Sequence, residues 1–184
     1  MRYTSRKRYS WSHNLAYAVG LLSSDGNLSC DNRHVGLVSK DMEQIENFKD
    51  CLGLNSNLRQ KKSNLTDNLY YEIQFSDVAL YDFLLDVGLS PRKSLVLGEL
   101  KIPDQYFFAF LRGYLDGDGC CYGYFDKRWR NSYMIYIQFT SGSINHLKWI
   151  NSKIQKFLGF SGKIKSQTRA YNLVFAKKSS LSLS

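Results

Sequence analysis

Two short segments of this chain are near-copies of each other. Residues 16–26 read AYAVGLLSSDG and residues 109–119 read AFLRGYLDGDG, at a constant offset of 93 residues. Small residues recur at steps of four in both copies, and such steps fall on one face of a helix. A face without side-chain bulk lets two helix backbones approach closely, which offsets the cost of glycine in a helix, about 1 kcal/mol. We therefore expect two helices packed side by side, with Ala16, Gly20, Ala109 and Gly113 at their interface.

Each copy ends in an aspartate followed by glycine, Asp25 in the first and Asp118 in the second. If the helices run in the same direction, both acids reach C-terminal helix ends, where the macrodipole is already negative. Two close carboxylates either raise one pKa or recruit a cation, and a hard divalent ion such as Mg²⁺ takes oxygen ligands. The backbone carbonyls of Ser24 and Gly117 can add ligands. The alternative is a plain helix end with a left-handed glycine cap, and the shared register of the copies favours the metal site.

Composition narrows the class of protein. With 184 residues, 43% hydrophobic and 15% aromatic, the chain has enough apolar material for one packed domain or two small ones. A net charge of +9 indicates a polyanionic partner such as nucleic acid, although ribosomal and membrane-surface proteins share this balance. The sequence has no run of 18 apolar residues and no apolar core after its basic start. We expect no membrane segment and an intracellular location, in the cytoplasm or an organelle matrix.

The four cysteines give no sign of a zinc site. They show no Cys-x-x-Cys spacing, and the sequence has only three histidines. Reduced and mostly buried thiols are expected in a reducing compartment. Because neighbouring residues on a strand point to opposite faces, one of Cys120 and Cys121 is expected in the core and the other near the site.

The segments after the two copies repeat one order of elements. Hydrophobic patterning predicts two strands within 27–38 about a turn at 31–33, a helix at 40–52, strands at 57–62 and 69–75, and a helix at 77–87. In the second half it predicts strands at 121–125 and 133–140, a helix at 143–158, and strands at 162–168 and 170–175. The predicted fold class is α/β, more closely α+β, with a duplicated αββαββα unit. We place the first repeat and an N-terminal tail at 1–100 and the second repeat at 101–184, its closing helix missing after Lys177.

Alternation along the expected strands puts polar side chains on one face of each sheet. Lys and Arg hold phosphates or read guanine, and Gln and Asn pair with adenine, so such a face suits a nucleic-acid groove. An ordinary solvated sheet face would also be polar, and the recurrence in both copies favours DNA. The candidate contacts are Asn27, Ser29, Arg33, Arg59, Lys61, Tyr70, Glu72, Gln74, Tyr122, Tyr124, Lys127, Arg128, Arg130, Tyr136, Gln138, Lys163, Lys165 and Gln167.

The two copies also point to a family. Residues 18–26 and 111–119 resemble the signature of the LAGLIDADG homing endonucleases, in the form that carries two motifs on one chain. The resemblance covers nearly the whole chain, and the second copy, LRGYLDGDG, is highly specific. The first copy departs from the signature at Ser23, where an acid usually stands, and keeps Asp25.

The resemblance implies a fold and an activity. The fold would be the αββαββα unit in pseudo-twofold repeat, with the motif helices at the domain interface and the sheets forming a saddle over the DNA major groove. The activity would be that of a monomeric endonuclease that hydrolyses both strands of a long double-stranded DNA target with Mg²⁺, or with Mn²⁺ or Ca²⁺ in the same sites. Its gene would be intron-encoded or free-standing, and an intein is not expected because the chain shows no splicing domain.

Site residues follow from the resemblance as well. In this family the last acid of each motif is a metal ligand, which makes Asp25 and Asp118 the implied catalytic residues. The family often places a lysine after the last helix of the first repeat, and Lys93 is the matching candidate. By position rather than by motif, Lys40 at the end of the second strand is a weaker one.

Two rival functions stay open. A paired-carboxylate enzyme such as a glycosidase would use two acids but would not explain the charge. A binding module that kept the fold and lost cleavage, such as an RNA maturase or a transcription regulator, is the stronger rival. Such proteins generally lose one motif acid, and the presence of both acids here favours the nuclease.

Overall fold

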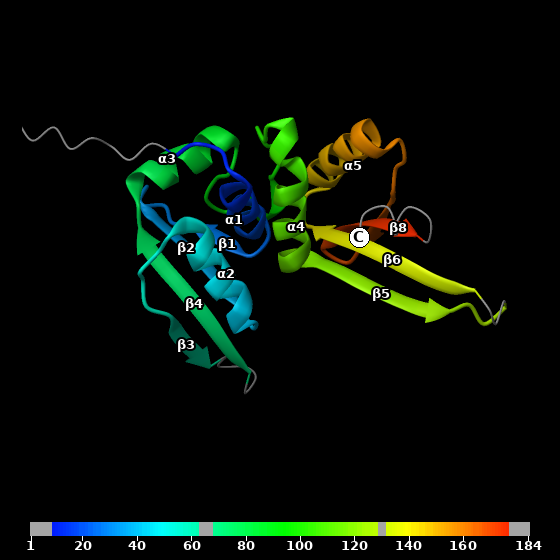
Figure 1. The fold of residues 1–184 in the computed structure, drawn as a ribbon, viewed down its shortest axis with the longest axis horizontal. Coiled ribbons are helices and arrows are strands. Elements are labelled where there is room, and N and C mark those ends of the chain that lie inside the picture. The colour runs from blue at the N-terminus through cyan, green and yellow to red at the C-terminus, as the bar shows by residue number, and fades with distance from the viewer. Residues whose placement is uncertain (1–8, 63–67, 129–131, 177–184) are drawn as a thin grey trace, which may run out of the picture. The chain divides into compact units, whose positions relative to one another are not determined.

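The computed structural model describes residues 9–62, 68–128 and 132–176, and Figure 1 shows its fold. The chain divides into two compact units. Among the described residues, the first unit runs to Lys93 and also includes Leu100–Gly117. The second unit consists of Ser94–Glu99 and the residues from Asp118 onward.

The first unit contains four α-helices and a four-stranded antiparallel sheet in its described part. The sheet has the order β1-β2-β4-β3. Helices α1, α2 and α3 contact the strands of this sheet. The bounds are α1 (His13–Ser24), β1 (Gly26–Leu28), β2 (His34–Ser39), α2 (Met42–Leu52), β3 (Arg59–Lys62), β4 (Leu69–Ser76), α3 (Val78–Val87) and α4 (Phe107–Asp118), whose last residue begins the second unit.

Local sequence signals explain where these helices begin and end. The Ser12 hydroxyl caps α1 by accepting from the Leu15 N–H, and Asp41 and Asp77 cap α2 and α3 in the same way. Gly53 and Gly88 end α2 and α3 in the left-handed conformation, with φ of 62° and 113°. These boundaries agree with the predicted helices to within two residues.

The second unit repeats part of this architecture with one long helix. Strands β5 (Gly119–Phe125), β6 (Tyr133–Ser141), β7 (Lys163–Gln167) and β8 (Ala170–Ala176) form an antiparallel sheet of order β5-β6-β8-β7. Helix α5 (Ile144–Leu158) contacts β6 and β8. The segment Ser94–Glu99 joins this unit where the Gly98 carbonyl lies 2.7 Å from Nδ1 of His146.

Each unit has its own apolar core between helices and sheet. In the first, Leu37, Ile73 and Phe48 are fully buried; in the second, Leu147, Ile150 and Leu173 are. The predicted α+β fold with two antiparallel sheets is therefore confirmed. No helix in the described part of the chain is long and apolar enough to cross a membrane.

The left-handed glycine cap that stood as the alternative to a metal site is not formed: Gly26 is the first residue of β1, as Gly119 is of β5, and neither has a positive φ. Two sequence expectations about local structure are wrong. The thiols are not mostly buried, because Cys30, Cys120 and Cys121 are exposed and Cys51 is half-buried. Neither cysteine at the start of β5 is a core residue, since every position of this edge strand after Gly119 is exposed.

Some expectations lie outside the described residues. The missing closing helix after residue 176 and the contact residue Arg130 belong to segments that the structure does not describe. The repeat boundary at 100/101 stays a prediction, while the spatial units divide differently, because α4 up to Gly117 packs with the first unit.

Candidate functional site: the motif helices and the sheet faces

Helices α1 and α4 meet at glycine within the first unit. A Cβ atom added at Gly20 would overlap the Phe110 carbonyl oxygen and lie 2.7 Å from the Tyr114 nitrogen. A Cβ at Gly113 would overlap the Tyr17 carbonyl oxygen. Contacts of residue 17 with 113 and of residue 24 with 117 show that the helices run in parallel. Ala16 is fully buried, whereas Ala109 is half-exposed at the rim of a separate pocket.

The parallel packing brings the end of α4 to Asp25. A Cβ at Gly117 would overlap the Ser24 hydroxyl and would lie 3.2 Å from Oδ2 of Asp25. Asp25 is exposed and ends α1 with a right-handed backbone, φ −91° and ψ −5°. Asp118, also exposed, follows Gly117 as the last residue of α4. Glycine at 117 is therefore required for the first acidic motif to contact the second motif.

An open pocket of about 350 Å³ lies beside Asp25 in the first unit. Its walls come from the ends of α1 and α4, the end of β2, the start of α2 and strand β4. It offers carboxylate, amide, hydroxyl and ammonium groups together. The lining residues are Asp25, Val38, Ser39, Lys40, Asp41, Gln44, Tyr70, Asp116 and Gly117.

The two candidate lysines differ in exposure and in the groups that they contact. Lys40 is exposed in the pocket, and its Nζ lies 5.5 Å from the centre of the Tyr70 ring. Lys93 is only 5% exposed, and its Nζ donates to the Gly26 carbonyl and, at 3.5 Å, to the Ser24 carbonyl. A cation at a helix C-terminus is favourable, so Lys93 stabilises the turn that carries Asp25.

A polar cluster that includes two lining residues of the pocket, Gln44 and Asp116, was missed by sequence reasoning. The Tyr17 hydroxyl donates to the Asp116 carboxylate at 2.8 Å, and Gln44 donates through Nε2 to the Asp116 carbonyl. Burial first, and then this hydrogen bond, raises the pKa of Tyr17 well above its usual value. Gln44 carried a signal, because it lies one helical turn from Phe48 on the apolar face of α2.

The departure of the first motif at Ser23 has a local explanation. Ser23 is 4% exposed, and its hydroxyl donates to the Val19 carbonyl at 2.7 Å. The matching residue of the second motif is Asp116, which is exposed and accepts from Tyr17. An acid at position 23 would be buried in the first unit, where an uncompensated charge is costly.

The outer face of the first sheet collects its predicted contact residues. Residues that are paired across neighbouring strands lie on the same face of a sheet. In the first sheet Arg59 is paired with Glu72, and Lys61 with Tyr70. Asn27 is paired with Gly36, which is itself paired with Gln74, so all the predicted contacts of these strands lie on one face. All four residues of β3 are exposed. Lys61 forms an ion pair of 2.6 Å with Glu72, which offsets part of the positive charge. Ser29 is half-buried and Arg33 is exposed beside Asp31 in the turn after β1.

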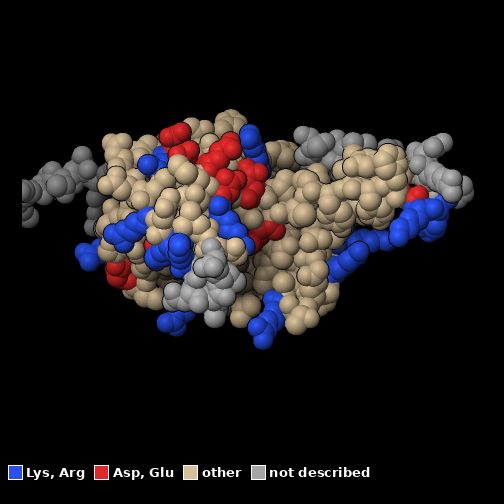
Figure 2. All heavy atoms as spheres, turned by 90° about the horizontal axis from the view of Figure 1, so that it is seen from below, with Lys and Arg blue, Asp and Glu red and all other residues tan. Residues whose placement is uncertain are grey.

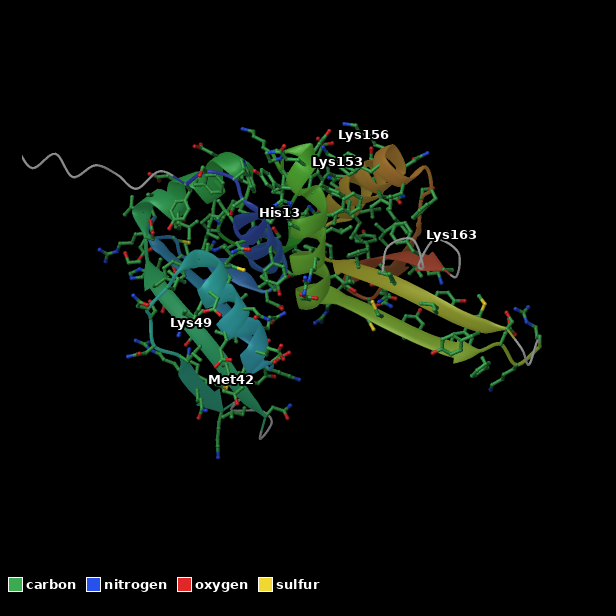
Figure 3. All side chains as sticks on the ribbon, viewed as in Figure 1. His13, Met42, Lys49, Lys153, Lys156 and Lys163 are labelled. Atoms are coloured by element: carbon green, nitrogen blue, oxygen red, sulfur yellow. The ribbon has the colours of Figure 1, made fainter. Side chains whose placement is uncertain are left out.

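The second sheet has an outer face of different chemistry. Tyr122 pairs with Tyr136, and Gln138 lies in register with Val174 and Lys163. This face is less open than the sequence suggests, because Asn172 and Val174 are buried on it. The exposed members of the predicted set are Tyr122, Tyr124, Lys127, Arg128, Lys163, Lys165 and Gln167, and the half-exposed ones are Tyr136 and Gln138. Figure 3 labels Lys163 at the start of β7.

The donor set around Asp25 fits a hydrated divalent ion. Carboxylate and carbonyl oxygens suit Mg²⁺ or Mn²⁺, and Mg²⁺ is usually held by one or two carboxylates while it keeps several waters. Among the described residues there is no group of three or more His, Cys, Asp or Glu side chains that would form an all-protein cage. The site therefore suits an ion that shares its coordination sphere with water and a further ligand.

Known proteins share this arrangement of helices and sheets, although their sequences differ. The sequence matches no protein-family model and no curated protein. Solved structures match at low identity. Full-length DUF199/WhiA from Thermatoga maritima aligns with a TM-score of 0.63 and 12% identity, over 95% of this chain and 55% of that one. Mesophilic variants of the homing endonuclease I-DmoI align with a TM-score of 0.60 and 16% identity, over 93% and 92%.

The chain has the LAGLIDADG fold. The homing endonuclease I-WcaI, bound to its DNA recognition sequence, shares it with a TM-score of 0.62 and 12% identity, over 91% of this chain and 77% of that one. The chain spans little more than half the length of full-length WhiA. Because the LAGLIDADG fold occurs both in homing endonucleases and in WhiA, the fold by itself does not establish cleavage.

Proposed function

We propose that this protein is a site-specific DNA endonuclease that hydrolyses both strands of a long double-stranded target with divalent metal ions. The observation that carries the proposal is the contact of Asp25 with Gly117, the residue before Asp118, at the ends of two parallel helices. The polar outer faces of both sheets and the net charge of +9 support a DNA partner. Structural neighbours solved with DNA, two of them with Mn as well, add support.

The proposed roles begin with the two motif acids. Asp25 and Asp118 would hold the ions, with help from the carbonyls of Gly117 and Ser24. Divalent ions supply an acidified water and neutralise charge on the phosphate oxygens. The Ser24 carbonyl also accepts from Lys93, so this lysine fixes the backbone on which Asp25 depends.

Lys40 is the cation of the pocket with access to a substrate. Its side chain is exposed beside Asp25 and is held over the Tyr70 ring. A lysine in this place can stabilise negative charge that develops on a phosphate in the transition state. Lys93, being buried against carbonyls, acts in this proposal as a positioning residue. We propose a monomer, because one chain supplies both motifs.

A non-cleaving DNA-binding protein is the second candidate. The observation that favours it is the sharing of the fold with WhiA. Both candidates predict DNA binding, and they differ in whether bonds are broken.

A cleavage assay separates the two candidates. A target is first selected from a random duplex library, and the full chain is then incubated with it in Mg²⁺, Mn²⁺ or EDTA. We expect both strands to be cut with either metal and not in EDTA. Asp118→Asn should abolish cleavage and retain binding, whereas Lys40→Met should slow cleavage by about 10²-fold or more.

The outcomes are distinct. Specific binding without cleavage in either metal would leave the non-cleaving alternative. Unchanged cleavage by Asp118→Asn would show that the site has been assigned to the wrong residues. Lys62→Met, which removes an exposed lysine of β3 outside the pocket, is the matched control for Lys40.

A further inference from the structure

The net positive charge of the chain comes from residues 118–184. Residues 1–117 contain 14 Lys and Arg and 14 Asp and Glu, whereas residues 118–184 contain 11 Lys and Arg and only two Asp. In Figure 2 both acidic and basic side chains gather over the first unit, whereas the second unit shows Lys and Arg along its rim with little red. Attraction for a polyanion therefore falls on the second unit.

The same unit exposes a row of aromatic rings on its sheet. On the outer face of the β5–β6 hairpin, the Tyr136 ring is stacked on both Tyr122 and Tyr124, with centroids 5.2 Å and 5.6 Å apart. The ring planes differ by only 11° and 12°, so the three rings share one orientation. We call Tyr122, Tyr136 and Tyr124 the tyrosine ladder.

The ladder is exposed because β5 is an edge strand. Tyr122 is 43% exposed and Tyr124 is 49% exposed. Monomeric proteins seldom leave a contiguous group of aromatic rings open to solvent without a binding role. Lys127 and Arg128 follow at the end of β5, and Lys163 and Lys165 stand exposed across the same face.

The chemistry of the ladder favours stacking over hydrogen bonding to phosphate. The hydroxyl oxygens of Tyr124 and Tyr136 lie 3.2 Å apart and bond to each other. This hydrogen bond raises the pKa of Tyr136. The surface that remains available on Tyr122 and Tyr124 is their ring faces and edges.

We propose that the tyrosine ladder stacks with unpaired nucleobases, so that the second unit binds single-stranded nucleic acid in addition to duplex. Bases within a duplex hide their faces in the stack, whereas unpaired bases extend a column of aligned aromatic rings and the flanking lysines hold the phosphates. The stacking contact within the ladder fixes Tyr122 and Tyr124 in advance, which lowers the entropic cost of binding. The inference rests on the proposed function only in taking this sheet face as a nucleic-acid surface.

Fluorescence anisotropy of the full chain tests the inference. The probes are fluorescein-labelled oligothymidylate, oligouridylate of the same length, and the oligothymidylate duplex with oligoadenylate. The Tyr122→Leu/Tyr124→Leu variant should bind both single strands about ten-fold or more weakly, because stacking contributes roughly 1–3 kcal/mol per base. The Tyr122→Phe/Tyr124→Phe variant, which keeps the rings, should bind them as the parent does.

Tyr133→Leu is the matched control. Tyr133 lies on the same hairpin and is 48% exposed, but it stacks edge-on against Phe125 on the opposite face. We expect this variant to bind single strands normally, and circular dichroism checks that each variant is folded. The two single-stranded probes distinguish DNA from RNA as the natural source of the bases.

Three results would overturn the inference. The first is that Tyr133→Leu lowers the affinity for single strands as much as the double Leu variant does. The second is that the double Leu variant binds single strands as tightly as the parent. The third is that the parent binds single strands no more tightly than an unrelated control protein does. Failure of the inference is distinguishable from failure of the nuclease proposal. Duplex cleavage without single-strand binding removes the inference alone, and ladder-dependent single-strand binding without cleavage removes the nuclease alone.

Discussion

At the scale of single residues, the decisive positions are those with no side chain. Gly20, Gly113 and Gly117 each face backbone or polar atoms of the partner helix closely enough that a methyl group would overlap them. Their neighbours at Gly20 are main-chain atoms of α4, which cannot rotate aside as a side-chain end can. The contact on which Asp25 depends therefore rests on helix geometry rather than on any particular side-chain pair.

Gly20→Ala should destabilise the protein although alanine is the better helix former. Alanine gains about 1 kcal/mol in helix propensity, but overpacking costs typically 1–3 kcal/mol, and here the overlap is with backbone. We expect the free energy of unfolding in urea to fall by about 1–2 kcal/mol. Gly98→Ala is the control, because a Cβ at Gly98 meets nothing within 4 Å and its substitution should be neutral. A stabilised Gly20→Ala variant would mean that α1 and α4 are not in contact.

At the scale of elements, the two motif helices are held together both by close backbone contact and by side-chain hydrogen bonds. Gly20 and Gly113 let the backbones touch, and Asp116, near the C-terminal end of α4, accepts hydrogen bonds from Tyr17 of α1 and Gln44 of α2. Arg112 lies over the Tyr17 ring at 5.8 Å and lies 4.0 Å from Asp116. The offset of 93 residues matches Tyr17 with Phe110 and Asp116 with Ser23, so the positions equivalent to the Tyr17–Asp116 pair hold Phe110 and Ser23, which cannot form the same hydrogen bond.

The Tyr17 hydrogen bond should give stability that disappears in alkali. The folded-state pKa of Tyr17 is raised above its unfolded value of about 10, so its stabilising effect is complete below pH 10 and is lost as pH rises further. Tyr17→Phe should lower the free energy of unfolding by about 1 kcal/mol at neutral pH. Between pH 9 and pH 11 the free energy of unfolding of this variant should fall by less than that of the parent. Urea titrations at each pH measure both quantities.

A control keeps this result specific to Tyr17. Tyr133→Phe removes the hydroxyl of an exposed tyrosine in the other unit and should follow the parent at every pH. If Tyr17→Phe shows the same alkaline loss as the parent, the hydrogen bond to Asp116 does not contribute to stability.

Most elements could be predicted from the sequence because their signals are local. Left-handed glycines at 53, 88 and 159 end three helices, and alternation of Leu, Ile and Phe defines the central strands. What could not be predicted depends on tertiary contacts. The partner of Gln44, the burial of Lys93 under the Asp25 turn and the exposure of Cys121 each depend on which segment covers the residue, and no local pattern encodes that.

The candidate site shows the same division between local and tertiary information. Repetition of the motif predicted Asp25, Gly117 and the helix contact. Stacking of Tyr122, Tyr136 and Tyr124 was not anticipated, although their shared face followed from alternation, because ring orientation depends on the register between β5 and β6.

At the scale of the whole molecule, the distribution of charge predicts which contacts depend on salt. The first unit balances its charges, as in the ion pair of Lys61 with Glu72, whereas the second has a large excess of Lys and Arg. Contacts with phosphate release counterions, and each contributes close to one unit to the slope of log affinity against log salt concentration.

Lys163→Gln/Lys165→Gln should therefore lower this slope by about 1–2 for duplex DNA. Lys61→Gln/Glu72→Gln, which removes a neutral pair from the first sheet, should leave the slope nearly unchanged. Binding isotherms at several concentrations of KCl give the slopes. Equal slopes for the lysine variant and the parent would place the phosphate contacts elsewhere.

A chain with all its excess charge at one end approaches a long polyanion in a preferred orientation. The second unit is attracted from a distance and arrives first, whatever the sequence of bases beneath it. The first unit follows by covalent attachment, because its own charges nearly balance. Two units of identical charge would have no such preferred order of approach.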